Sequence, residues 1–189
     1  MNFDFSNLVK DERHKHLTFL DTTPDSEPTY NILGVGITDL AISYNPSVDS
    51  EKWIVEAAAR HIHSSNEKNA SVSQTIYLGD PCYEFVEAGR DKLNYKTNIL
   101  DVNMSKKVDG DKFYAELTAG MIAVTSYLGE EATLEFDLYW EGDKTVGSVD
   151  VSSGKPVFTP SPESVALANA KASETSIKVN TTTKKNEEF

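Results

Sequence analysis

Residues 77–93 read Tyr77-Leu-Gly-Asp-Pro-Cys-Tyr-Glu-Phe-Val-Glu-Ala-Gly-Arg-Asp-Lys-Leu93. This stretch predicts the one helix of a chain that otherwise has the pattern of strands. Asp80 can accept a hydrogen bond from a free N–H of the first turn, and Pro81 at the first helical position loses no hydrogen bond. Helical spacing gives an apolar face and an acidic face. The apolar face of this helix comprises Cys82, Phe85, Val86, Gly89 and Leu93. Its acidic outer side comprises Glu84, Glu87 and Asp91. A helix of about three and a half turns is marginal alone, so we expect it to pack on a sheet.

The composition favours one acidic domain with a tail. A chain of 189 residues can bury roughly 70% of its unfolded surface in a single domain. Its 30 acidic and 18 basic side chains give a net charge of −12, which repels nucleic acid backbones and disfavours a DNA-binding protein. No apolar run approaches the roughly 20 residues of a membrane span, and the N-terminus lacks the pattern of a signal peptide. A single cysteine, Cys82, cannot form an intrachain disulfide, so we expect a cytoplasmic protein that does not contact membranes.

Before the predicted helix, the chain alternates like strands with one polar interruption. Residues 30–44 alternate on two parities, which predicts a strand with a bend near Asp39. Residues 51–56 and 71–78 predict two further strands, and the polar segment 57–69 between them predicts the mobile tip of a long hairpin arm.

After the helix, residues 99–105 predict a half-buried strand, and 108–111 predict a hairpin turn. Residues 112–125 predict a long strand with a bulge at Gly120, and 141–144 predict another turn. The clearest strand pattern, at 134–140, has apolar residues on one side and acidic residues on the other. A last short strand is expected at 156–158, followed by a short helix through Asn169 and then a disordered segment. The sequence therefore predicts a mainly β fold with one helix and a long hairpin arm.

Candidate catalytic and metal sites are weak. The pairs His14-x-His16 and His61-x-His63 each place two imidazoles on one strand face, but no third ligand is specified, so solvent-exposed or structural histidines are favoured. Cys82 has no positioned base, which a cysteine nucleophile requires. We therefore expect no enzymatic activity, no cofactor and no metal.

The acidic residues Glu135, Asp137 and Glu141 fall on one face of one predicted strand. Such a face is commonly the solvated outer side of a sheet. The alternative is a functional negative wall. The residue pattern leaves both interpretations open.

Three stretches together resemble the major tail tube proteins of long-tailed, non-contractile bacteriophages. They are Glu-Lys-Trp-Ile-Val-Glu at 51–56, Ser-Gln-Thr-Ile-Tyr-Leu-Gly-Asp-Pro-Cys-Tyr-Glu-Phe-Val at 73–86, and the acidic alternating strand near Trp140. In that family a similar tryptophan-containing strand precedes a polar arm, and a Gly-Asp-Pro element opens a helix. The resemblance covers about residues 30–158.

The resemblance implies a tail-tube type fold, which is a β-sandwich or partly open barrel with one flanking helix. It implies an N-terminal arm at 1–29, a tail-tube β domain at 30–158 and a flexible tail at 159–189, which is too short for the added domain of some members. It also implies a virion tail protein, assembled in the host bacterial cytoplasm, whose copies form hexameric rings that stack into a tube for DNA ejection. A tape measure protein in the lumen, a tail terminator and tail-tip proteins are the implied partners.

The resemblance also suggests roles for particular residues. Glu135, Asp137 and Glu141 become candidate lumen acids, since an acidic wall repels passing DNA. The N-terminal segment and the arm become candidate contacts with the next ring, through Arg60, His61, His63, Asn66 and Lys68. The alternative function is a monomeric β-sandwich binding module, for example one that binds carbohydrate through Trp53, Tyr77 or Trp140.

Overall fold

The computed structural model describes residues 9–55, 57–129 and 131–167 and shows a mainly β protein. The strands are β1 (His16–Asp21), β2 (Tyr30–Ile32), β3 (Pro46–Glu51), β4 (Arg60–Asn66), β5 (Asn69–Thr75), β6 (Tyr95–Asp109), β7 (Lys112–Tyr127), β8 (Thr133–Asp150) and β9 (Val157–Pro160). The helices are a 3-10 turn η1 (Arg13–Lys15) and the α-helix α1 (Pro81–Ala88). Residues 162–167 are also helical, as the sequence predicts for part of that segment.

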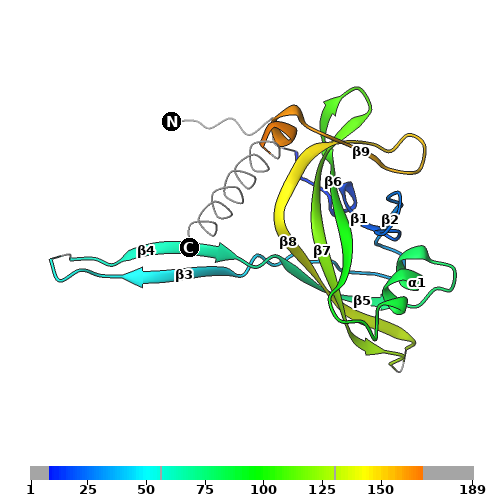
Figure 1. The fold of residues 1–189 in the computed structure, drawn as a ribbon, viewed down its shortest axis with the longest axis horizontal. Helices are drawn as coiled ribbons and strands as arrows, with labels where there is room; N and C mark the ends of the chain where they lie inside the picture. The colour runs from blue at the N-terminus through cyan, green and yellow to red at the C-terminus, as the bar shows by residue number, and fades with distance from the viewer. Residues whose placement is uncertain (1–8, 56, 130, 168–189) are drawn as a thin grey trace, which may run out of the picture.

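One antiparallel sheet forms the body of the protein, and a separate hairpin forms its arm. The sheet has the order β2-β1-β6-β7-β8-β5, with β9 pairing the end of β8. It curls into a half-barrel, and the small helix α1 flanks it (Figure 1). Strands β3 and β4 pair only with each other and project away from the body (Figure 1). The mainly β fold with one flanking α-helix is therefore confirmed.

Strand β8 is continuous where the sequence predicts a turn. It pairs β5 through residues 133–139 and β9 through residues 147–150. Between these halves, the register with β7 shifts, so that residues 142–144 lie opposite Thr118. Gly142 has a φ of 69°, which side chains rarely adopt, and it allows the strand to bulge without ending. The predicted turn at 141–144 is thus wrong, because the same glycine serves a bulge.

The predicted bulge at Gly120 is also misplaced, because the nearest register shift falls between Leu117 and Ala119. A glycine is required at position 120 because the neighbouring strand leaves no room for a side chain. A Cβ there would lie 2.4 Å from Cδ1 of Ile99 on the neighbouring strand.

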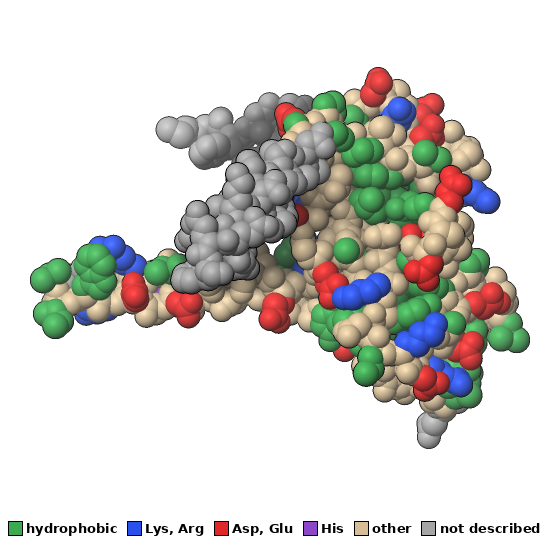
Figure 2. Space-filling model, in the orientation of Figure 1, with side chains coloured by type: hydrophobic (Ala, Val, Ile, Leu, Met, Phe, Trp, Pro, Cys, Tyr) green, Lys and Arg blue, Asp and Glu red, His purple; other side chains and the backbone are tan. Residues whose placement is uncertain are grey.

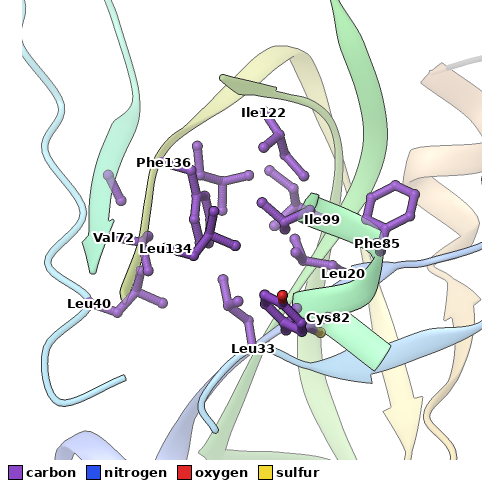
Figure 3. Packing of buried hydrophobic residues seen from close by; sticks show 14 of the residues in the cluster. Leu20, Leu33, Leu40, Val72, Cys82, Phe85, Ile99, Ile122, Leu134 and Phe136 are labelled. Atoms are coloured by element: carbon purple, nitrogen blue, oxygen red, sulfur yellow. The ribbon is translucent and has the colours of Figure 1, made fainter. Parts of the chain in front are cut away.

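The sheet buries apolar side chains on both of its faces. Ile99 and Leu100 are consecutive on β6 and both fully buried, yet they belong to different clusters, since successive strand residues point to opposite faces. The larger cluster lies between the sheet and α1 with the loop after β2, on what we call the helix face (Figure 3). The smaller cluster, around Phe19, Leu100 and Val149, lies on the opposite face. The half-buried prediction for 99–105 is therefore wrong at its first residues.

Helix α1 begins where the sequence predicts and ends earlier. The Asp80 carboxylate accepts hydrogen bonds from the backbone N–H of Cys82 at 3.2 Å and of Tyr83 at 3.3 Å. The helix ends at Ala88 because the chain turns at Gly89, against which the Tyr95 ring packs so closely that a Cβ would lie 2.1 Å from it. Leu93, which was predicted to lie on the apolar face, is therefore exposed.

The strands predicted before the helix differ most from the structure. Residues 30–44 form only the short β2 and then a loop, which touches β5 through bridges at Ile37 and Ser43. Gly36 has a φ of 73° and lies against the carbonyl of Thr75, so the alternating pattern cannot continue as a strand. The arm strands are β3 and β4, and residues 53–55 lie at the arm's turn rather than in a strand.

The predicted division into an arm, a domain and a tail stays a prediction. Strand β1 falls inside the range 1–29 and pairs with β6 in the main sheet. Residues 1–8 and 168–189 lie outside the described residues.

Candidate assembly surfaces

The arm exposes apolar side chains on its strands and at its tip. Every residue of β3 and β4 is exposed, including Val48 and Ile62. The tip adds Trp53, Ile54 and Val55, and hydrophobic side chains gather at the far end of the arm (Figure 2). An isolated two-stranded hairpin is at best marginally stable in water. The arm therefore has the character of a segment that is stabilised by contact with another surface.

The candidate arm residues from the sequence do not all lie on the arm. Arg60, His61, His63 and Asn66 belong to β4, whereas Lys68 lies beyond it, in the body. The His63 Nε2 atom lies 2.8 Å from Oδ1 of Asn66 and 3.0 Å from the Ser65 carbonyl oxygen. The guanidinium of Arg60 stacks over the Trp53 ring at 4.3 Å. These contacts order the two ends of β4 locally.

The root of the arm is tied firmly to the body. The backbone N–H of Trp140 donates to the carbonyl of Lys68 at 3.0 Å. Ser43 and Asn69 exchange two backbone hydrogen bonds at 2.8 and 2.9 Å. These bonds hold both strands of the arm at the point where they leave the body. The sheet therefore sets the direction of the arm.

Near the root of the arm, the Asp101 carboxylate accepts hydrogen bonds from three side chains that are distant in the sequence. Oδ2 accepts from Lys68 Nζ at 2.9 Å and from Trp140 Nε1 at 2.9 Å. Oδ1 accepts from Thr18 Oγ1 at 2.9 Å. Lys68 Nζ also lies 4.4 Å from the centroid of the Trp140 ring. The side chains of Lys68 and Asp101 are only 18% and 19% exposed, so solvent screens this pair weakly.

We predict that Asp101→Asn lowers the free energy of unfolding by about 2 kcal/mol, because an amide cannot accept all three hydrogen bonds and leaves Lys68 without its counter-ion. Urea unfolding measures the change. Glu141→Gln is the matched control, since its pair with Lys96 is far more exposed and is worth less than about 1 kcal/mol. Equal losses in the two variants would contradict the structural role of Asp101.

The three candidate lumen acids, Glu135, Asp137 and Glu141, lie on the face of the sheet opposite to the helix face. Glu135 is exposed, and Asp137 and Glu141 are partly buried. Asp137 accepts hydrogen bonds from Ser71 at 2.6 Å and from the Tyr139 hydroxyl at 3.4 Å. Lys96 Nζ lies 2.5 Å from Glu141. Partial burial and the charge of Asp137 both raise the pKa of Tyr139. We call this surface, formed by Glu135, Asp137, Tyr139 and Glu141, the acidic face.

The structure gives no support to a cysteine nucleophile. Cys82 is fully buried, and its Sγ donates to the carbonyls of Asn31 and Ile32. Burial raises the pKa of its thiol to about 12. Among residues 9–55, 57–129 and 131–167, no three His, Cys, Asp or Glu side chains group as metal ligands. In the same part of the chain, no helix has the length and hydropathy needed to cross a membrane.

The aromatic residues of the alternative binding module are not brought together. Trp53 lies at the arm tip, Tyr77 is exposed in the loop between β5 and α1, and Trp140 is buried at the arm root. The structure therefore forms no common site from these three residues, and each would have to act separately.

The sequence matches no protein-family model and no curated protein. Among solved structures, the chain is similar to one in an extracellular contractile injection system, described as the PVC sheath/tube terminator in the extended state. The TM-score is 0.44 and the identity 9%, over 74% of this chain and 98% of that one. A chain of the anti-feeding prophage baseplate gives a TM-score of 0.41 and 10% identity, over 74% of this chain and 96% of that one. Likeness at this level identifies no family for the chain.

Proposed function

We propose that this protein is a structural virion protein of the tail-tube type, without enzymatic activity. Its copies join into hexameric rings that stack into a tube, and DNA leaves through the bore. A tape measure protein occupies the bore beforehand, and tail terminator and tail-tip proteins close the ends. Assembly takes place in the cytoplasm of the bacterial host.

The arm is the observation that carries this proposal. Apolar side chains lie exposed from Val48 at its base to Ile54 at its tip, while its root is fixed to the sheet. Burying them against a neighbouring copy would remove apolar surface from water, which is the main favourable term in association. The resemblance of residues 51–56 and 73–86 to major tail tube proteins supports the same function.

The acidic face supports the lumen assignment. It lies on a curled sheet, on the side that α1 does not cover, and a ring of curled sheets has one such face toward its axis. Carboxylates on that wall repel phosphates within the roughly 8 Å over which salt leaves charges unscreened. DNA would then pass without binding.

Reversing the charge of the acidic face should make assembled tubes retain DNA. We expect Glu135→Lys with Asp137→Lys to bind double-stranded DNA in a salt-dependent manner, because two charges facing the bore change sign and the net charge rises by four units. Cosedimentation of tubes with labelled DNA measures retention. Glu84→Lys with Asp91→Lys is the matched control, since both residues are exposed on or beside α1 and the net charge changes equally. Equal retention in both double variants would contradict a lumenal position.

Sedimentation velocity over a wide range of protein concentration tests self-assembly. The proposal predicts species of discrete higher mass that grow with concentration. A single-chain species throughout, together with binding to a glycan array, would support the monomeric binding module instead.

A further inference from the structure

A pocket of about 400 Å³ opens on the helix face beside the arm root. Alternation along β6 and β7 directs Asp101, Tyr114 and Glu116 to this face, beyond the part that α1 covers. Tyr44 from the loop before the arm forms another wall. The volume of the pocket lies within the range typical of ligand sites.

The two acids of the pocket are already neutralised. Lys68 pairs with Asp101 at 2.9 Å, and Lys144 Nζ lies 2.6 Å from Oε1 of Glu116. Burial of Glu116 opposes its ionisation, but hydrogen bonds from Lys144 and Tyr114 outweigh burial, so the pKa of Glu116 lies below its ordinary value. Each of the two carboxylates therefore has its own ammonium partner.

Two further cations line the pocket without a carboxylate. Arg13 donates to the backbone carbonyls of His16 and Leu40, which leaves other guanidinium N–H groups unused. The ammonium of Lys106 lies 5.1 Å from the centroid of the Tyr114 ring. Neither side chain forms an ion pair with any carboxylate of the described residues. The pocket thus has a local excess of positive charge on a protein whose net charge is −12.

Apolar surface accompanies these cations. Leu40 and Ile42 line the pocket together with the rings of Tyr44 and Tyr114. Inorganic phosphate or a sulfated glycan would leave this apolar surface uncovered. A peptide with acidic and aromatic side chains would match both the charge and the apolar walls.

We propose that this pocket is a binding site for an acidic, aromatic-containing peptide segment of a partner protein. Arg13 and Lys106 hold its carboxylates, and the tyrosine and aliphatic walls cover its aromatic side chain. The site does not depend on the arm tip or on the acidic face, so it stands or fails separately from the tube function.

Fluorescence anisotropy of a fluorescein-labelled peptide, Glu-Glu-Phe-Glu-Glu, tests the proposal with the full chain at low salt. We expect saturable binding that weakens as salt rises. Lys106→Glu and, separately, Arg13→Glu should each weaken binding by at least about tenfold, since each places a repelling charge beside the carboxylates. Lys52→Glu on the arm is the matched control and should leave binding unchanged. The peptide Lys-Lys-Phe-Lys-Lys should not bind.

Three outcomes would overturn the proposal. The first is absence of binding up to millimolar peptide. The second is binding that neither Lys106→Glu nor Arg13→Glu weakens. The third is binding of heparin, sensitive to the same two substitutions, where the acidic peptide does not bind, which would assign the pocket to a polyanionic glycan. Thermal unfolding of each variant separates lost binding from lost folding.

Discussion

The double substitution Ile54→Ser with Val55→Ser is expected to abolish self-assembly and leave the single chain folded. Both side chains are exposed at the arm tip, so serine costs the monomer almost nothing. If both are buried against a neighbouring copy, their loss removes about 3–6 kcal/mol of association free energy per contact. This corresponds to a loss of roughly 100-fold or more in affinity. Light scattering over a concentration series measures the assembled fraction.

A matched control is available at the other end of the body. Leu78 and Leu93 are likewise exposed aliphatic residues, and they lie in loops on either side of α1. Leu78→Ser with Leu93→Ser changes apolar surface by a similar amount, and we expect it to leave assembly largely intact. Equal loss of assembly in both double variants would show general sensitivity to surface hydrophobicity and would contradict a specific role for the arm tip.

Phe136→Ala should be the most destabilising single substitution of the sheet. Phe136 is 1% exposed near the start of β8 and packs in the cluster that joins the sheet to α1 (Figure 3). Truncating a buried phenylalanine leaves a cavity and costs about 3–5 kcal/mol. Chemical denaturation followed by tryptophan fluorescence measures the loss.

Leu128→Ala is the control for this prediction. Leu128 is exposed after the end of β7, so we expect a change within about 0.5 kcal/mol. A loss for Phe136→Ala no larger than that of the control would contradict the burial of β8 against α1.

Local signals in the sequence were sufficient for the start of α1 and for the faces of β8. The Asp-Pro pair at 80–81 specifies a helix start through its own backbone chemistry, and the alternation at 134–140 specifies which side is buried. Neither signal depends on a distant part of the chain, which is why both could be predicted.

Strand ends and partners could not be predicted in the same way. An alternating pattern shows the faces of a strand but not the strands that pair with it, so the switch of β8 from β5 to β9 leaves no local mark. Gly142 carries the same signal for a bulge as for a turn. Residues 53–55 look like a buried strand because they are apolar, whereas the structure leaves them exposed at the arm tip.

The Asp101 cluster shows the same limit at the level of the site. Lys68 and Trp140 lie 33 and 39 positions from Asp101, and only the pairing of β5, β8, β7 and β6 brings them together. The arm root and its pocket form only when strands that are distant in the sequence pair in the correct register. No motif in the sequence predicts either feature.

Negative-stain electron microscopy of the purified full chain at near-neutral pH, before and after concentration, tests the central claim most directly. Assembly into a tube predicts rings or hollow filaments with a regular axial repeat, which the Ile54→Ser, Val55→Ser variant should not form. Particles of single-chain size at every concentration would contradict the claim that this protein assembles into a tube by itself.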